Sequence, residues 1–162
     1  MLIPKNTYHQ FMSECERLHI DPCLYYNIDL YIYKRRFLDH QAIVIDFGGQ
    51  STLTIELCFI NNILRLQTLF RAYKYKCVKQ NIKPIKTTLI KCFQIGVEII
   101  NNFGTYSHFN NCQDFVTIYL SKFNIKRKDW SDRSIVYGIY LCTGIIWIFR
   151  VYRSINNLKV IK

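Results

Sequence analysis

The sequence contains little that would divide it into separate domains. Only six Gly and three Pro occur among 162 residues, and no stretch is rich in Gly, Pro or Ser. We find no internal repeat, and these absences exclude a linker between two folded domains. Half of the residues are hydrophobic and 15% are aromatic, which excludes a disordered chain. The length therefore indicates one folded domain with terminal appendages.

The seven cysteines lack the spacing of a metal site or a disulfide framework. Their number is odd, no C-x-x-C pair occurs, and no His/Cys cluster has the spacing of a zinc site. The first residues also lack the apolar run of a signal peptide. We expect a protein in reducing, cytosolic surroundings, in which most thiols are core residues.

Acidic residues are scarce, and the chain is strongly basic. Asp and Glu number 11 against 22 Lys and Arg, which gives a formal net charge of +11. This balance favours an anionic partner such as a nucleic acid or the acidic cytoplasmic leaflet of a membrane. A genome-wide bias toward Lys, Asn, Ile and Tyr codons explains it equally well. The basic residues occur in short scattered groups without a nucleic-acid motif, so we expect no nucleic-acid partner.

Hydrophobic periodicity predicts strands in the first half of the chain and helices in the second. The predicted strands are 24–33, 42–47, 51–60 and 64–76, and Gly48-Gly49 forms a turn between the second and third. Apolar residues recur at helical spacing over 89–100, and a second helix begins near Asn111. Strands followed by helices predict an α+β fold, in which an antiparallel sheet packs on helices.

Cys112 is the strongest candidate for a reactive residue. It follows Asn110-Asn111, and because Asn is a favoured N-cap, Cys112 is predicted in the first turn of a helix. Backbone N–H groups and the positive end of the helix dipole favour the thiolate there, and can stabilise an oxyanion. His40, at the beginning of a predicted strand, is the predicted base, with His108 as the alternative.

Two stretches of the chain carry a family resemblance. One is Asp29-Leu30 followed by His40-Gln-Ala-Ile-Val-Ile, and the other is Asn111-Cys-Gln-Asp-Phe-Val. They resemble the His strand and the Asn-Cys-Glu-His-Phe-Val box of lecithin–retinol acyltransferase-like domains, over residues 24–123. The resemblance implies a circularly permuted papain-like fold with the His strand before the Cys helix. It also implies acyl transfer from, or hydrolysis of, lipid esters through an acyl-thioester on Cys112, without a cofactor.

The third residue of the predicted site departs from the family pattern. Related domains usually carry a second His on the next strand, about a dozen residues after the first, and this sequence has none there. The interval from His40 falls on Thr52, while Thr54 or Glu56 would follow from a change of register. The predicted catalytic residues are therefore Cys112, His40 and Thr52. Position 41 is Gln where the family often has Trp, which alters the pocket wall.

The C-terminal segment is the candidate for membrane attachment. Residues 135–149 carry no charge and are almost wholly apolar. As a helix they would span about 22 Å, and about 27 Å with Arg150–Tyr152 included, against a hydrocarbon core of roughly 30 Å. We interpret the segment as a tail anchor on the cytoplasmic face of an intracellular membrane; the alternative is a buried helix or strand pair. The predicted division is an N-terminal extension 1–23, a catalytic domain 24–130 and a hydrophobic segment 131–162.

Three functions follow from these observations. The first is a monomeric thiol acyltransferase or phospholipase that takes lipid acyl donors and acceptors at a membrane. The second is a cysteine peptidase or isopeptidase of related fold. The third is a basic binding module that keeps the fold without turnover.

Overall fold

The computed structural model describes residues 5–34, 40–49, 51–60, 63–71, 77–104 and 111–128, all within one compact unit, Met1–Lys128. The elements, in chain order, are α1 (Lys5–Arg17), β1 (Tyr25–Lys34), β2 (Gln41–Asp46), β3 (Thr52–Ile60), β4 (Ile63–Arg71), β5 (Cys77–Lys79), β6 (Ile85–Thr88), α2 (Leu89–Asn102) and α3 (Cys112–Ser121). The α+β class predicted from the sequence, with an antiparallel sheet packed on helices, is confirmed.

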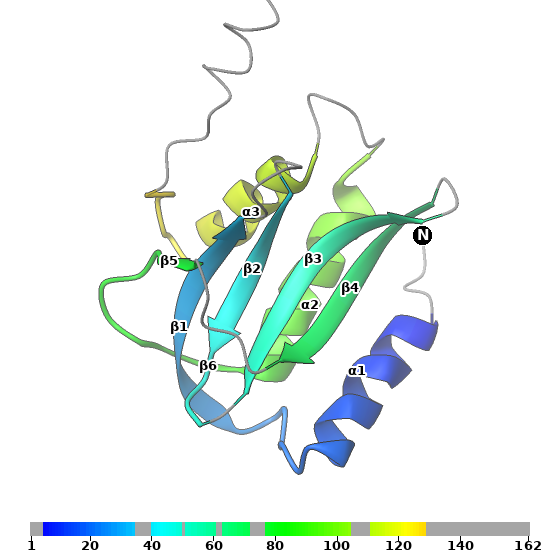
Figure 1. Ribbon diagram of the computed structural model, residues 1–162, viewed down its shortest axis with the longest axis vertical. Helices are drawn as coiled ribbons and strands as arrows, with labels where there is room; N and C mark the ends of the chain where they lie inside the picture. The colour runs from blue at the N-terminus through cyan, green and yellow to red at the C-terminus, as the bar shows by residue number, and fades with distance from the viewer. Residues whose placement is uncertain are drawn as a thin grey trace, which may run out of the picture. The chain divides into compact units, whose positions relative to one another are not determined.

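The sheet is an antiparallel meander extended by two short strands. Its strand order is β4-β3-β2-β1-β5, and β6 pairs with the beginning of β1 (Figure 1). The hairpin between β2 and β3 turns through Gly48 and Gly49, whose φ angles of 87° and 86° lie in the left-handed region that glycine tolerates. Its register pairs Ala42 with Glu56 and Asp46 with Thr52. This register decides which side chains of β3 can approach the beginning of β2.

One face of the sheet is apolar and packs against the helices. Alternate residues of the strands, such as Ile43, Ile45 and Ile55, are fully buried there with Phe115 and Tyr119 of α3. Figure 1 shows α2 and α3 behind the sheet. The hydroxyl of Tyr119 donates a hydrogen bond of 2.9 Å to the Cys92 carbonyl, which joins α3 to α2. These contacts hold the beginning of α3 over the beginning of β2.

Helix α1 belongs to the same core, although residues 1–23 were predicted to be an extension. Phe11 is fully buried, and its ring stacks on Phe93 of α2 with centroids 4.6 Å apart. Cys15, one helical turn later, is also buried. The sequence did not show this packing because α1 is polar apart from these few anchors. The folded unit therefore includes residues before position 24.

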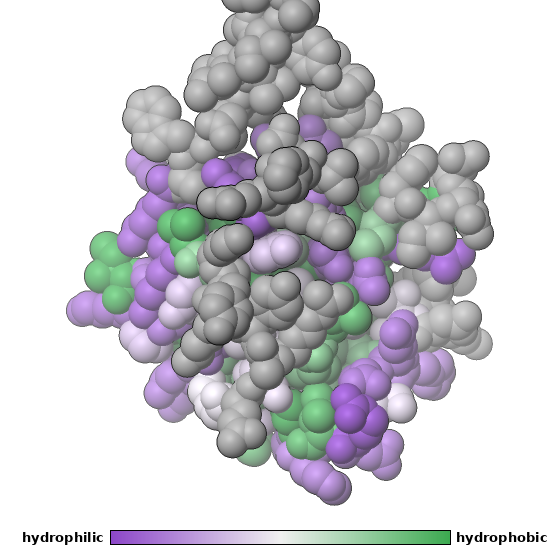
Figure 2. All heavy atoms as spheres, viewed as in Figure 1, coloured by the Kyte–Doolittle hydropathy of each residue, from purple (hydrophilic) through white to green (hydrophobic). Residues whose placement is uncertain are grey.

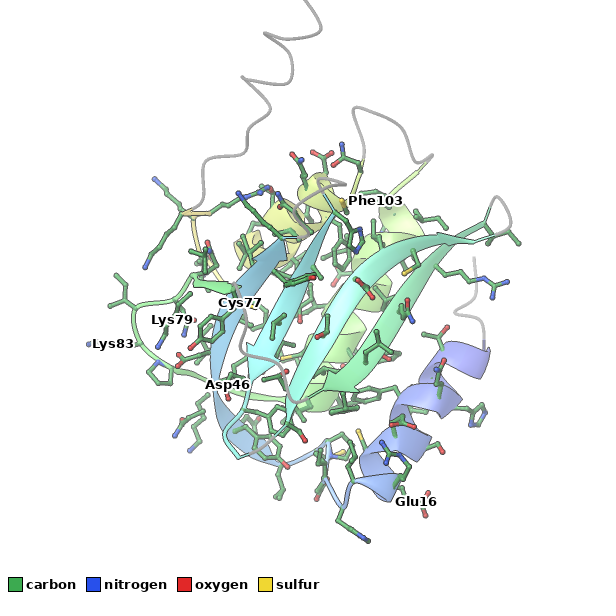
Figure 3. All side chains as sticks on the ribbon, in the orientation of Figure 1. Glu16, Asp46, Cys77, Lys79, Lys83 and Phe103 are labelled. Carbon is green, nitrogen blue, oxygen red and sulfur yellow. The ribbon has the colours of Figure 1, made fainter. Side chains whose placement is uncertain are left out.

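The segment after β4 forms two strands that the sequence analysis did not predict. Asn81 holds the connection between β5 and β6 on β1: its Oδ1 accepts from the Leu30 amide (2.7 Å), and its Nδ2 donates to Asp29 Oδ1 (2.9 Å). Figure 3 shows Lys79 and Lys83 at this edge of the sheet. Lys79 pairs with Asp29 at 2.7 Å. Asn81 thus supplies, through its side chain, contacts that a longer strand would make through its backbone.

The predicted hydrophobic segment 131–162 lies outside the described residues. Among the helices of the part that is described, none is long and apolar enough to cross a membrane. The visible described surface is largely hydrophilic, with apolar side chains in small separate groups (Figure 2).

Candidate active site

The beginning of α3 is fixed by a complete capping box. The Asn111 side chain accepts a hydrogen bond from the Gln113 amide (2.9 Å), and the Asp114 carboxylate accepts one from the Asn111 amide (3.0 Å). Cys112 is consequently the first residue of the helix, as predicted, and is 5% exposed. The Gln113 N–H is committed to this cap, so it is not a donor for an oxyanion.

His40 lies immediately before β2 and interacts with the thiol of Cys112 and with the carboxylate of Glu56. Its Nε2 is 2.8 Å from Glu56 Oε2. The pKa of His40 is raised to about 9, first by its hydrogen bond with Cys112 and then by that with Glu56, while burial acts in the opposite direction. The structure therefore brings together two of the three predicted residues, Cys112 and His40.

Glu56 occupies the place beside His40 that the sequence analysis assigned to Thr52. Because side chains alternate along a strand, His40 is on the same face as Ala42, and Ala42 pairs with Glu56. Thr52 pairs instead with Asp46, which Figure 3 shows at the end of β2 remote from α3. Four residues of strand, about 13 Å, separate Thr52 from Glu56. The structure therefore does not bring Thr52 beside His40, and Glu56 is the candidate for that place.

The His40–Glu56 pair is partly enclosed. The side chains of His40 and Glu56 are 25% and 16% exposed. A carboxylate in such surroundings is screened less than on an open surface, so it holds the imidazole ring and favours its charged form. The predicted Thr could accept a hydrogen bond but carries no charge for this purpose.

The other described thiols differ from Cys112 in their surroundings. Burial raises the pKa of Cys15 and of Cys58 to about 11 and that of Cys92 to about 12. These three thiols stay protonated at neutral pH and are poor nucleophiles. Cys23 is exposed. Among the described thiols, Cys112 is the one that contributes to the raised pKa of His40.

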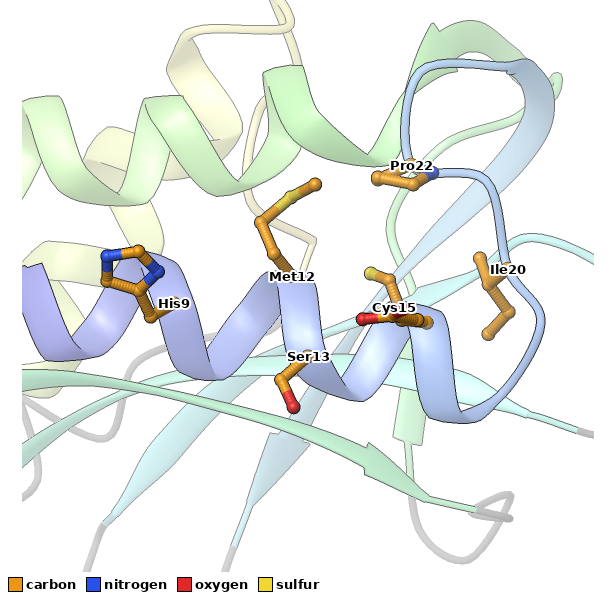
Figure 4. Close-up of a pocket in the computed structure, with 7 residues that line it drawn as sticks. His9, Met12, Ser13, Cys15, Ile20 and Pro22 are labelled. Carbon is orange, nitrogen blue, oxygen red and sulfur yellow. The ribbon is translucent and has the colours of Figure 1, made fainter.

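A pocket of about 400 Å³ lies elsewhere, between α1 and the turn that follows it (Figure 4). His9, Met12, Cys15, Ile20 and Pro22 are among its lining residues. The Cys15 thiol is buried and, as stated above, protonated. Because neither Cys112 nor His40 lines the pocket, its size does not bear on the candidate site.

Within the described ranges, no group of three or more His, Cys, Asp or Glu side chains is arranged to hold a metal ion. Comparisons of the chain with protein-family models, with curated proteins and with solved structures found no match.

Proposed function

We propose that this chain is a thiol-dependent acyltransferase or hydrolase of permuted papain-like type that acts on lipid esters. Cys112 is the nucleophile, His40 transfers the proton, and Glu56 orients and charges the imidazole. One observation carries the proposal: His40 makes a hydrogen bond with Cys112 and also lies 2.8 Å from the Glu56 carboxylate.

The proposed reaction has two halves. The Cys112 thiolate attacks the ester carbonyl carbon, and the tetrahedral intermediate collapses with cleavage of the bond to the alkoxy oxygen. The imidazolium of His40 gives its proton to that oxygen, so an alcohol leaves and an acyl-thioester remains. Neutral His40 then takes a proton from water, an alcohol or an amine, which attacks the thioester. The acyl product leaves, and the thiolate and imidazolium are restored.

The ionisation of His40 suits both halves. The raised pKa keeps the ring protonated before the first half, when a general acid is required. Cys112 is the largest cause of that raised pKa. Acylation of the sulfur removes its negative charge, so the pKa of His40 falls in the acyl-enzyme, when a general base is required. Glu56 remains in place and keeps the ring oriented.

Lipid esters are proposed as substrates because of the resemblance of the His40 and Cys112 stretches to lecithin–retinol acyltransferase-like domains. The order of the site in the chain, with the His before a strand and the Cys at the beginning of a later helix, is compatible with that fold. The formal charge of +11 is compatible with an anionic membrane surface.

The acyl-enzyme provides the test. The full chain is incubated with glycerophospholipid vesicles or with a peptide thiol-protease substrate, and the acyl adduct on Cys112 is sought by mass spectrometry. We expect an adduct from the lipid, no turnover in Cys112→Ala, and a loss of about 10²–10⁴ in kcat/KM in His40→Ala. Glu56→Gln should lower kcat/KM by a smaller factor. Glu98 is a surface carboxylate paired with Lys122, and Glu98→Gln should leave kcat/KM unchanged. Turnover of the peptide alone would replace the lipid proposal by a peptidase.

Membrane attachment is tested separately. Replacement of Ile145 and Ile146 by Asp places two charges in the apolar segment, which a bilayer disfavours by several kcal/mol. Vesicle binding should be lost, while hydrolysis of a soluble short-chain ester should be retained. Unchanged vesicle binding would contradict a tail anchor.

A further inference from the structure

Arg127 reaches back from beyond α3 to the beginning of that helix. The chain reverses at Asn124, which has a φ of 57°, and the Ile125 amide donates to the Leu120 carbonyl (3.1 Å). Arg127 then lies beside the first two turns of α3. Its Nη1 donates to the Gln113 carbonyl and to Thr117 Oγ1, at 3.2 Å each.

The other arm of the same guanidinium reaches the sheet. Arg127 Nη2 donates to the side-chain oxygen of Gln41. Gln41 follows His40 and is 3% exposed, and Gln113 follows Cys112 and is 9% exposed. A single planar side chain therefore joins the residue after the proposed base to the residue after the proposed nucleophile.

The placement of this charge needs an explanation. A cation is disfavoured near the positive end of a helix dipole, and the first turn of α3 is such a place. A structural link between α3 and the sheet already exists in the buried apolar contacts of Phe115 and Val116. What Arg127 adds is a connection of fixed geometry, because a guanidinium presents several donors in one rigid plane.

The segment that carries Arg127 makes one more hydrogen bond, through the residue that follows it. The amide of the next residue, Lys128, donates to Gln80 Oε1 at 2.8 Å, which attaches this segment to the residue after β5. The chain next to Arg127 is thus attached to the sheet by a contact that involves neither Gln41 nor Gln113.

We propose that Arg127 is a positioning residue that sets the separation of the His40 ring and the Cys112 sulfur. The inference rests on the proposed function of this site. Displacements of about 1 Å in such a site cost roughly 10²-fold in rate, so a connection between the two residues that follow the reacting pair has a large effect.

The test compares Arg127→Met and Arg127→Lys with Lys126→Met in the full chain. Lys126 is adjacent and exposed, so its substitution removes the same charge without touching the site. The readout is the pH dependence of Cys112 alkylation by iodoacetamide, followed by mass spectrometry. We expect Arg127→Met to slow the alkylation of Cys112 at pH 7 at least tenfold and to shift the pH dependence of that alkylation. Arg127→Lys, which cannot span both acceptors, should be intermediate, and Lys126→Met should match the wild type.

A double substitution separates positioning from folding. Gln41→Met removes the acceptor on the sheet and should reproduce the Arg127→Met profile. If both act through one connection, the double variant should be no slower than either single variant. Additive losses, or an Arg127→Met profile equal to that of Lys126→Met, would overturn the positioning role of Arg127 but not the proposed function of the site. Wild-type alkylation of Cys112 that is independent of His40 would overturn the proposed function together with it.

Discussion

The ionisation of His40 can be measured without any substrate, and its contacts in the structure fix the direction in which its pKa moves. The pKa of His40 is raised to about 9 from an ordinary 6.5. At pH 7.5 a pKa of 9 leaves about 97% of the ring protonated, whereas 6.5 leaves about 9%. We therefore expect the ring C–H signals of His40 in an NMR titration to change mainly above pH 8. The missing signal in His40→Gln would assign them.

Substitution of the two partners should lower this pKa in a fixed order. Cys112 is the larger cause and Glu56 the smaller, so Cys112→Ala should shift the titration of His40 further than Glu56→Gln does. Both shifts are downward, because each change removes a group that favours the imidazolium. Glu98→Gln, which removes a carboxylate paired with Lys122 on the surface, should leave it unchanged. A wild-type His40 that titrates between pH 6 and 7, unaffected by Cys112→Ala, would refute the contact on which the site depends.

Two further predictions concern the framework of the site. Asn111→Ala removes the N-cap of α3 and should lower the free energy of unfolding by about 1 kcal/mol in a urea titration; an unchanged value would mean that the cap does not hold the helix start. Phe11→Ala should cost about 3–5 kcal/mol, because the ring is fully buried against Phe93. His9→Ala, on the exposed side of the same helix, is its control, and equal effects would place α1 outside the core.

The parts of the fold that depend on local pattern could be predicted from the sequence. Alternation along β3 and the Asn before Cys112 are signals contained within a few residues, and both gave the correct element. The short strands β5 and β6 carry no such signal, because Asn81 holds the segment between them through contacts with Asp29 and Leu30, about fifty residues away. Arg127 was missed for the same reason: its acceptor, Gln41, is remote in the sequence.

Which residue lies beside His40 depends on the register of the β2–β3 hairpin and not on the interval along the chain. Counting a dozen residues from His40 gives Thr52. The Gly48-Gly49 turn instead makes a hairpin in which Asp46 pairs with Thr52 and Ala42 with Glu56. Glu56 is thus the carboxylate diagonal to His40 on the same face, and it could have been found from the turn alone.

The same register predicts at which other position of β3 a carboxylate would still raise the pKa of His40. Continued by two residue pairs beyond Ala42 and Glu56, the hairpin puts Cys58 opposite His40, on the same face as Glu56. In a Glu56→Gln background, Cys58→Glu should therefore restore part of the raised pKa of His40. Thr52→Glu in that background should not, because position 52 pairs with Asp46 about 13 Å along the strand. The NMR titration of His40 in the two double variants distinguishes them. Equal recovery in both would mean that net charge near the sheet, and not the contact with a carboxylate at the beginning of β2, sets the ionisation of the ring.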